Sequence, residues 1–340
     1  MGLEYEKGNE KYANWRAPLP ERKTLPERKT RVEQPERSIT PETLDWIKKF
    51  SAFSFQQSSD IRKRTQQGEP LDSVIYDLFM TSGKERYQED DPSFKQLQHE
   101  YRENLGRIFR RWSAESLLRQ NDPNPAIKMG KKMTKFVEEK SVDSLELPDS
   151  WIYFKLHGGA IPGERIGRLQ MNLLPQDTPR IFDEAIIALG KAGIRADIKT
   201  TNGDSATEFE RLEKITVYVN ASQAQKAFDV IRGVYARNEG SFQDGNTPFS
   251  KPLQDNHGEP TKGLWFVEEP AYTERKQMPD GHVEEQHFSA NQVRSKLLAD
   301  LFAEHQKHNY SKEEYTDAFK RLSKKYLINP LEPAFNLPQT

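Results

Sequence analysis

The stretch WIYFKLHGGAIPGERIGRLQMNLL, residues 151–174, predicts two strands. Apolar and polar residues alternate at each end of this stretch. Gly158-Gly159 and Pro162-Gly163 favour a turn between the two alternating runs. In residues 151–157 we expect the apolar side chains to face a core and the polar ones to face away. The polar set is Tyr153, Lys155 and His157.

The residues that follow complete an α+β pattern. Their apolar periodicity predicts a helix over 178–191, a strand over 194–199, a strand over 214–220 and a helix over 221–236. The order strand, strand, helix, strand, strand, helix predicts an α+β domain over residues 148–310. Its sheet is expected to be antiparallel or mixed, with helices packed on one face.

The C-terminal part of the sequence is less regular. We interpret 240–263 as loop, 264–268 as a short strand and 289–306 as a helix. A last helix is predicted to begin at Ser311, with Glu314 three residues later completing a capping box. A C-terminal helix and tail would then occupy 311–340.

The N-terminal part divides into a tail and a helical region. Residues 1–40 are polar, and LPERKT occurs twice in succession at 19–30. Such a segment buries too little apolar surface to offset its ordering entropy, so we predict disorder. It is either a plain tail or an export signal or partner-docking arm. From Thr40-Pro41, a cap followed by proline, the pattern predicts helices over 41–147.

The composition excludes several classes of function. With 51 basic and 52 acidic side chains among 340 residues, the formal charge of −1 gives no overall attraction to nucleic acid or membrane. The absence of cysteine excludes disulfides, thiol nucleophiles and cysteine-ligated metal. No apolar run reaches the ~20 residues that span a bilayer. This composition is compatible with the cytosol, and equally with a protein that must unfold for secretion.

Lys155 and His157 are the most informative pair of polar residues. Alternate residues of a strand project from one face roughly 7 Å apart, so an amine and an imidazole there can flank one substrate group. They suit a base and an acid if burial and nearby cations lower the lysine pKa. A polar strand face that meets water is the alternative reading. Tyr153 and Tyr218 are expected on the same side, either donating to a ligand or packing their rings.

Four cations are expected around the same sheet face. Arg165 and Arg168 lie across the turn, and Lys199 and Arg211 lie near the ends of the next strands. Cations that converge on one face would bind a doubly charged phosphate. Each one alone is equally consistent with a solvated side chain. No residue cluster has the spacing of a metal site, so we expect neither metal nor cofactor.

Several segments resemble the HopA-type effector family. The signature strand of that family resembles GRLQMNLLP at 167–175. The other similar blocks are RLE at 211–213 before VYV at 217–219, NTPFSKPL at 246–253, GLWFVEEP at 263–270, and the helix entered by 289–294. The resemblance covers residues 150–305. It departs from the family at Glu213, where aspartate is common, and over 291–293.

This family distantly resembles phosphothreonine lyases and also occurs as the lyase component of lanthipeptide biosynthesis. In such enzymes a lysine removes the α-proton of a phosphorylated residue and a histidine protonates the departing phosphate. The resemblance therefore implies Lys155 as the base and His157 as the acid. It implies a phosphate-binding set of Arg165, Arg168, Lys199, Arg211, Tyr218, Lys251 and Arg294.

The implied function is cofactor-free β-elimination of phosphate from phosphoserine or phosphothreonine, giving dehydroalanine or dehydrobutyrine. The expected substrate is a phosphorylated peptide or protein. A kinase is the expected partner in lanthipeptide biosynthesis, and a secretion chaperone is the expected partner of a type III effector involved in virulence. The expected location is the bacterial cytoplasm, or a host cell if the protein is secreted. The alternative is a non-catalytic effector that binds a host protein through residues 41–140 and the tail. A shared cleft of Lys155, His157 and several cations would favour the enzyme, and scattered side chains would favour the binder.

Overall fold

A computed structural model describes residues 58–81, 86–118, 127–129, 147–148, 151–161, 164–245, 247, 249–277, 283–330, 334 and 336. The predicted tail over 1–40 and the helix start at Thr40 lie outside these residues. The boundaries of the predicted domains remain predictions.

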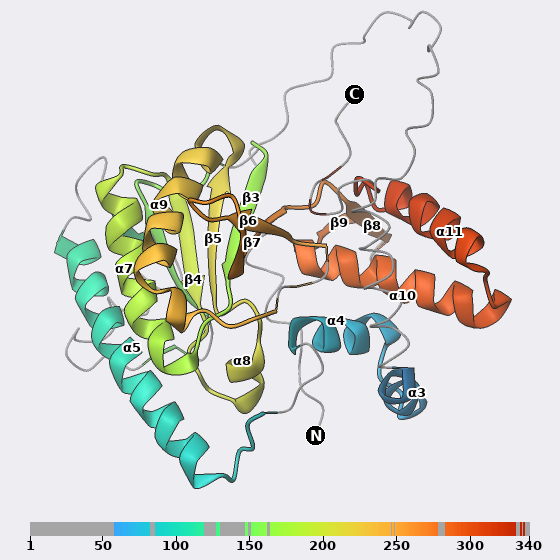
Figure 1. Ribbon diagram of the computed structural model, residues 1–340, viewed down its shortest axis with the longest axis horizontal. Coiled ribbons are helices and arrows are strands. Elements are labelled where there is room, and N and C mark those ends of the chain that lie inside the picture. The colour runs from blue at the N-terminus through green and yellow to red at the C-terminus, as the bar shows by residue number, and fades with distance from the viewer. Residues whose placement is uncertain are drawn as a thin grey trace, which may run out of the picture.

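Within the described residues, seven strands form one sheet in which every pair is antiparallel (Figure 1). In sheet order they are β1 (Ile127–Met129), β2 (Ile152–Leu156), β4 (Ala196–Thr200), β5 (Ile215–Asn220), β3 (Ile166–Met171), β7 (Pro260–Glu268) and β6 (Lys251–Gln254). The strands at the centre are almost wholly buried, which explains their richness in β-branched and other apolar residues.

One face of the sheet is covered by helices (Figure 1). These are α5 (Pro92–Leu118), α7 (Thr178–Lys191) and α9 (Ala224–Arg237). Short 3-10 helices lie next to α7 and α9: η3 (Pro175–Asp177), η4 (Ala221–Gln223) and η5 (Glu239–Ser241). The short helix α8 (Ala206–Glu210) follows β4. Phe154 of β2 lies 6.3 Å, ring centroid to ring centroid, from both Phe109 of α5 and Phe182 of α7. The apolar stripes of the helices and the alternate residues of the strands therefore share one core.

A second core lies beside the sheet, on the side away from α7 (Figure 1). It is built by α3 (Ser58–Gln66) and α4 (Leu71–Thr81) together with α10 (Ala290–His308) and α11 (Lys312–Lys325). Phe249 stacks on Phe319 with their ring centroids 5.7 Å apart, which ties the segment before β6 to this core. Two ends of the described chain thus meet in one helical layer.

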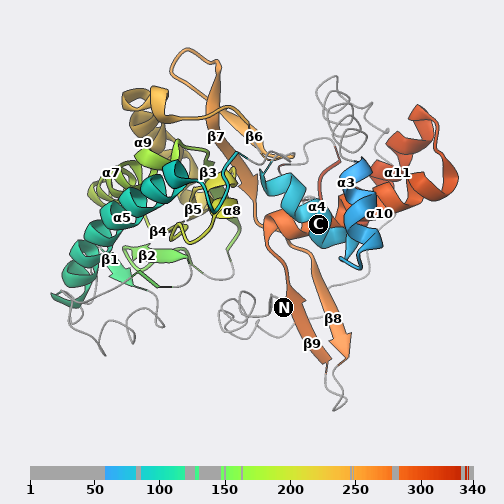
Figure 2. The same ribbon diagram turned by 90° about the horizontal axis from the view of Figure 1, so that it is seen from below.

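A two-stranded ribbon of β8 (Thr273–Gln277) and β9 (Val283–His287) projects from the body between β7 and α10 (Figure 2). Its residues are mostly charged or polar, and Val283 is exposed. The ribbon was not predicted, because it has no apolar face from which a period of two can be recognised.

The predicted α+β class, an antiparallel sheet with helices on one face, is confirmed. The helix predicted over 178–191 is α7, and Ser311 and Glu314 form the predicted capping box of α11. The interpretation of 240–263 as loop was wrong in part, because β6 and the first residues of β7 lie there. We find no helix among the described residues that is long and apolar enough to cross a membrane.

Replacement of Gly263 by alanine is expected to lower the free energy of unfolding by about 2–4 kcal/mol. Gly263 has a φ of +64°, and a Cβ there would lie 2.3 Å from the carbonyl oxygen of Gln243 and 2.8 Å from that of Asn172. Chemical denaturation followed by circular dichroism measures the change. Gly240→Ala is the matched control, because a Cβ at Gly240 meets nothing within 4 Å. Equal stability of the two variants would contradict the expectation.

Candidate functional site

The face of the sheet opposite α7 carries polar side chains from four neighbouring strands. Residues that are paired in register project from the same side of a sheet. In this sheet Lys155 pairs with Asp197, Asp197 with Tyr218, and Tyr218 with Arg168, while Lys199 lies two residues from Asp197 on β4. Alternation along β2, β4, β5 and β3 thus brings two lysines and an arginine to one polar face.

Lys199 is at the centre of this face. Its Nζ lies 3.9 Å from the ring centroid of Trp151 and 5.6 Å from that of Tyr218. Lys199 is half-buried, and it makes no hydrogen bond or ion pair within the described residues. Burial, reinforced by Arg168 and Arg211, lowers the pKa of the Lys199 ammonium to about 7. A large share of this amine is therefore neutral at physiological pH.

Two arginines flank Lys199, and each shares an aromatic ring with it. The guanidinium carbon of Arg168 lies 4.8 Å from the ring centroid of Tyr218, and that of Arg211 lies 5.2 Å from that of Trp151. We refer to Arg168, Lys199 and Arg211 as the cationic cluster. Because guanidinium groups bind phosphate oxygens in pairs, such a cluster can hold a phosphate dianion.

Carboxylates hold both arginines in place. Arg211 lies 3.0 Å from Glu213, whose other oxygen accepts hydrogen bonds from Gln170 and from Asn291, the latter at 2.9 Å. Burial by itself would raise the pKa of the Glu213 carboxyl, but the cationic cluster holds that pKa below its ordinary value. Arg168 is bound in the same way by Glu269.

Several buried polar atoms near the cationic cluster have no hydrogen-bond partner. Among the described residues these include Asp197 Oδ1, Thr216 Oγ1, Arg211 Nε and Asn291 Oδ1. Thr216 is the register partner of Lys199 on β5, and Asp197 lies two residues away on β4. Buried polar groups are usually paired, so this concentration indicates a face that receives a polar ligand or ordered water.

Lys155 lies beside the cationic cluster on the same face. Its Nζ is 3.9 Å from Asp197 Oδ1, and burial raises the pKa of the Asp197 carboxyl to about 6 although Lys155 opposes this shift. Gly159, with a φ of +81°, leaves room for that carboxylate, because a Cβ at Gly159 would lie 2.3 Å from Asp197 Oδ1. The turn after β2 is therefore shaped around the Lys155–Asp197 pair.

His157 does not lie on the same face as Lys155, and this part of the sequence prediction was wrong. β2 ends at Leu156, and His157 has a φ of +48°. Its Nε2 lies 2.8 Å from the carbonyl oxygen of Gly190 in α7, the helix that packs on the opposite face. The backbone turn before Gly158-Gly159 rotates the imidazole away from the position that strand alternation would give it.

Arg165 and Lys251 also lie apart from the cationic cluster. Arg165 is exposed before β3, and its Nε donates to Glu268 at 2.6 Å. Lys251 is exposed on the edge strand β6 and pairs in register with Phe266, whose ring packs against α9. Lys251 therefore lies on the helical side of the sheet.

Arg294 lies at the start of α10 and is completely buried. It donates hydrogen bonds to the backbone carbonyls of Ala290 at 3.1 Å and Ala334 at 3.2 Å, and lies 3.5 Å from that of Glu268. Burial, with a contribution from Arg168, lowers the pKa of its guanidinium to about 9. These bonds fasten α10 to the end of β7, so Arg294 supports the frame behind the cluster.

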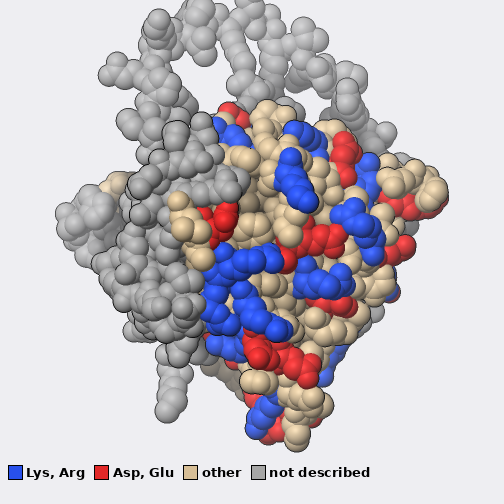
Figure 3. Space-filling view, turned by 90° about the vertical axis from the view of Figure 1, so that its left-hand side faces the viewer, with Lys and Arg blue, Asp and Glu red and all other residues tan. Residues whose placement is uncertain are grey.

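The side of the molecule formed by the helices carries charges of both signs, unlike the cationic cluster. Figure 3 shows basic and acidic groups intermixed over it. Arg111 of α5 pairs with Asp183 of α7 and stacks on Trp112, with 4.7 Å between the guanidinium carbon and the ring centroid. The arginines of α5 are thus engaged with neighbouring side chains, in keeping with a solvated helix face.

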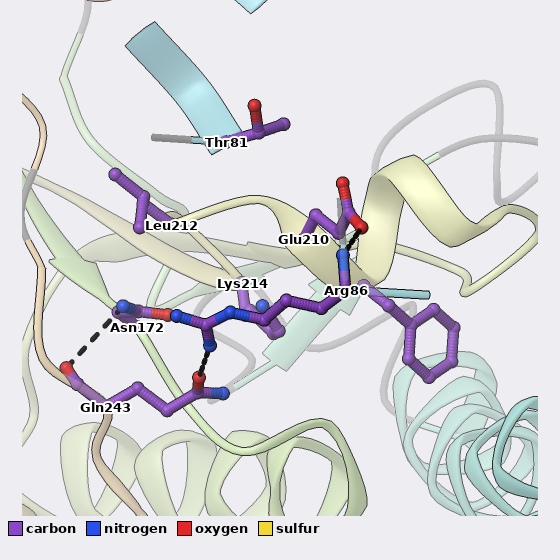
Figure 4. A pocket seen from close by; sticks show the side chains of 8 residues that line it. Thr81, Arg86, Asn172, Glu210, Leu212, Lys214 and Gln243 are labelled. Carbon is purple, nitrogen blue, oxygen red and sulfur yellow. Dashed lines mark hydrogen bonds between the residues drawn. The ribbon is translucent and has the colours of Figure 1, made fainter. Parts of the chain in front are cut away.

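A small pocket, whose lining does not include Lys199, is shown in Figure 4. Its lining residues are Thr81, Arg86, Asn172, Phe209, Glu210, Leu212, Lys214 and Gln243. The candidate reaction site is placed at the cationic cluster, because cations, aromatic rings and unpaired polar atoms meet there.

Sequence reasoning missed Trp151, Glu269 and Lys214, which no spacing in the sequence connects to the cluster. No group of three or more His, Asp or Glu side chains fit for a metal occurs in the described ranges.

Comparisons with known proteins support the fold. No family model and no curated protein matches the chain. The structure is similar to an effector protein from Pseudomonas syringae pv. tomato strain DC3000, with a TM-score of 0.54 and 12% identity over 88% of this chain and 100% of that chain. An effector protein from Pseudomonas syringae pv. syringae strain 61 gives a TM-score of 0.52 with the same identity and coverage. The chain therefore shares the fold of these effectors, which agrees with the resemblance found in the sequence at the level of fold.

The lowered pKa of Lys199 should make the free energy of unfolding depend on pH. Its pKa of about 7 in the folded protein lies below its unfolded value, so the unfolded chain binds more protons between pH 7 and about 10. Wild type should therefore gain about 1 kcal/mol relative to Lys199→Met between pH 6 and pH 9.5, after allowance for partial solvent screening.

Denaturation of both proteins at the two pH values measures this difference. Lys199→Arg is the matched control, because an arginine stays charged at both pH values and should not share the gain. Parallel stability profiles for wild type and Lys199→Met would show that the amine titrates normally.

Proposed function

We propose that this protein is a phosphoserine or phosphothreonine lyase that eliminates phosphate from a peptide or protein. The observation that carries the proposal is the Lys199 amine, which has no hydrogen bond in the described part of the chain and is flanked by Arg168 and Arg211 on one sheet face. An amine with a lowered pKa is a base, and the arginines beside it bind an anion. β-Elimination requires both in one place.

Lys199 is the proposed base in place of Lys155. The neutral amine takes the α-proton of the phosphorylated residue, the Cα–Cβ double bond forms, and the Cβ–O bond breaks. Phosphate leaves with the electron pair of that bond and takes a proton from an acid. Lys155, an ammonium held near Asp197 on the same face, is the proposed donor. Solvent then carries a proton from Lys199 back to Lys155, which restores both groups.

Arg168 and Arg211 are the proposed phosphate ligands. In the absence of substrate their guanidinium groups are paired with Glu269 and Glu213, which keeps them oriented. Preorganised cations stabilise the negative charge that develops on the leaving phosphate without moving during the reaction. Tyr218 lies under Arg168 and limits the directions in which that guanidinium can point.

A phosphothreonine peptide incubated with the protein is expected to lose 98 Da, the mass of phosphoric acid, by mass spectrometry. Lys199→Met should lower the rate at least ~100-fold, because the base is removed. Lys155→Ala should lower it ~10–100-fold, because the leaving phosphate loses its proton donor. His157→Asn should stay within ~3-fold of wild type, since asparagine tolerates a positive φ and the ring lies on the other side of the sheet.

Other mass changes would contradict the proposal. A loss of 80 Da would indicate hydrolysis of the phosphate ester. Full activity of Lys199→Met would show that the base is elsewhere, and a His157→Asn variant as inactive as Lys199→Met would restore histidine as the acid. Circular dichroism of each variant controls for loss of the fold.

A non-catalytic effector that binds a host protein is the second candidate function, and the shared fold with two effector proteins favours it. The two candidates differ in one measurement. A binder would retain the phosphopeptide without changing its mass. Export into a host cell with a secretion chaperone, or action beside a kinase on a lanthipeptide precursor, is compatible with the proposed lyase.

A further inference from the structure

The hydroxyl of Thr216 is buried in β5 and has no hydrogen-bond partner within the part of the chain that the structure describes. The other buried threonines of the described strands, Thr200 and Thr261, each donate their hydroxyl to a backbone carbonyl. A buried hydroxyl without a partner destabilises a fold, because it has lost its bonds to water and gained none. The position of Thr216 therefore indicates a partner that reaches it in another arrangement of the site.

Lys199 is the neighbour of Thr216 that can supply this partner. The two residues are paired in register between β4 and β5, so their Cβ atoms are roughly 4.5–5.5 Å apart on one face. The neighbour on β3, Gln170, is committed, because its Oε1 accepts from Trp265 Nε1 at 2.6 Å and its Nε2 donates to Glu213. Lys199 makes no hydrogen bond with the described residues, and its flexible side chain can bring the amine to the hydroxyl.

The ring of Trp151 holds the amine of Lys199 on the other side. Lys199 Nζ lies 3.9 Å from the centroid of that ring, and the attraction between a cation and a ring face requires the positive charge. Once Lys199 loses its proton, this attraction is lost and the neutral amine can donate an N–H to a hydroxyl oxygen instead. Trp151 precedes β2 and Thr216 belongs to β5, while β4 with Lys199 lies between these two strands.

We propose that Thr216 is a positioning residue for Lys199: the charged amine rests on the ring of Trp151, and the neutral amine donates an N–H to the hydroxyl oxygen of Thr216. This hydrogen bond fixes the nitrogen and leaves its lone pair available to take the α-proton of the substrate. The inference rests on the proposed function, since it names a residue that positions the base of that reaction.

Burial is the largest cause of the lowered pKa of Lys199, and the charged groups around it add to the effect or oppose it. The charged and titratable groups on this face and beside it are Arg168, Arg211, Glu213, Glu269, Tyr153, Tyr218, Asp197 and Lys155. The two arginines lower the pKa further, and the two glutamates raise it. A hydrogen bond that only the neutral amine makes also lowers the pKa. Replacement of Thr216 by valine removes that bond and leaves every one of these charges in place.

The test measures the rate at which the N-hydroxysuccinimide ester of acetic acid acetylates Lys199 as a function of pH, with the product located by mass spectrometry of proteolytic peptides. Only the neutral amine reacts, so the midpoint of the profile reports the pKa of Lys199. Thr216→Val should raise this midpoint by about 0.5–1 pH unit, because the neutral amine loses one hydrogen bond. Thr216→Ser keeps a hydroxyl and should retain the midpoint of the wild type.

Chemical denaturation at pH 6 separates positioning from a packing role. At that pH the amine is charged, so Thr216→Val replaces a hydroxyl without a partner and should be at least as stable as the wild type. Thr261→Val is the matched control, because the hydroxyl of Thr261 bonds to the carbonyl oxygens of Leu253 at 2.9 Å and Leu264 at 2.7 Å. This control should lose stability and keep the wild-type midpoint of Lys199 acetylation.

On a phosphothreonine peptide, Thr216→Val should lower kcat at pH 7 about 3–10-fold and leave KM within ~2-fold of wild type. An unchanged acetylation midpoint in Thr216→Val overturns the inference, and so does a loss of stability at pH 6 as large as that of Thr261→Val. If no peptide loses 98 Da but the midpoint rises in Thr216→Val and not in Thr216→Ser, the lyase proposal fails and the pairing of Lys199 with Thr216 stands.

Discussion

Glu213 accepts hydrogen bonds or an ion pair from Arg211, Gln170 and Asn291, which come from the segment before β5, from β3 and from α10. The carboxylate is 2% exposed, so its charge is tolerated only because these groups surround it. It joins the sheet to the second helical core and orients one of the two arginines of the cationic cluster. Together with the hydrogen bonds of Arg294, this buried charge helps to fix the position of α10 and the frame behind Arg168.

The fold was predictable where a periodic apolar pattern coincides with burial. α7 was located from its stripe of apolar residues, and α11 from its capping box, because both signals are local. β6 was missed because it is an edge strand with a single buried residue, and the ribbon of β8 and β9 was missed because its residues are nearly all polar. Pairing between such strands is decided by distant parts of the chain.

The candidate site was predictable to the extent that strand alternation holds. Arg168, Lys199 and Tyr218 share a face because each lies inside a regular strand. His157 departs from the pattern because its backbone turns to a positive φ one residue after β2 ends. The role of Arg294 depends on carbonyl groups far away in the sequence, and no local pattern encodes such contacts.

The second core is assembled from the two ends of the described chain: α4, from residues 71–81, packs with α10 and α11, which are about 210 to 250 residues later. During synthesis the apolar side of α4 therefore stays uncovered until α10 and α11, residues 290–325, have been made. In that interval Val74, Ile75 and Phe79 are accessible to any protein that binds exposed apolar helices. A nascent or partly unfolded chain thus exposes an apolar helix face that is buried in the folded protein.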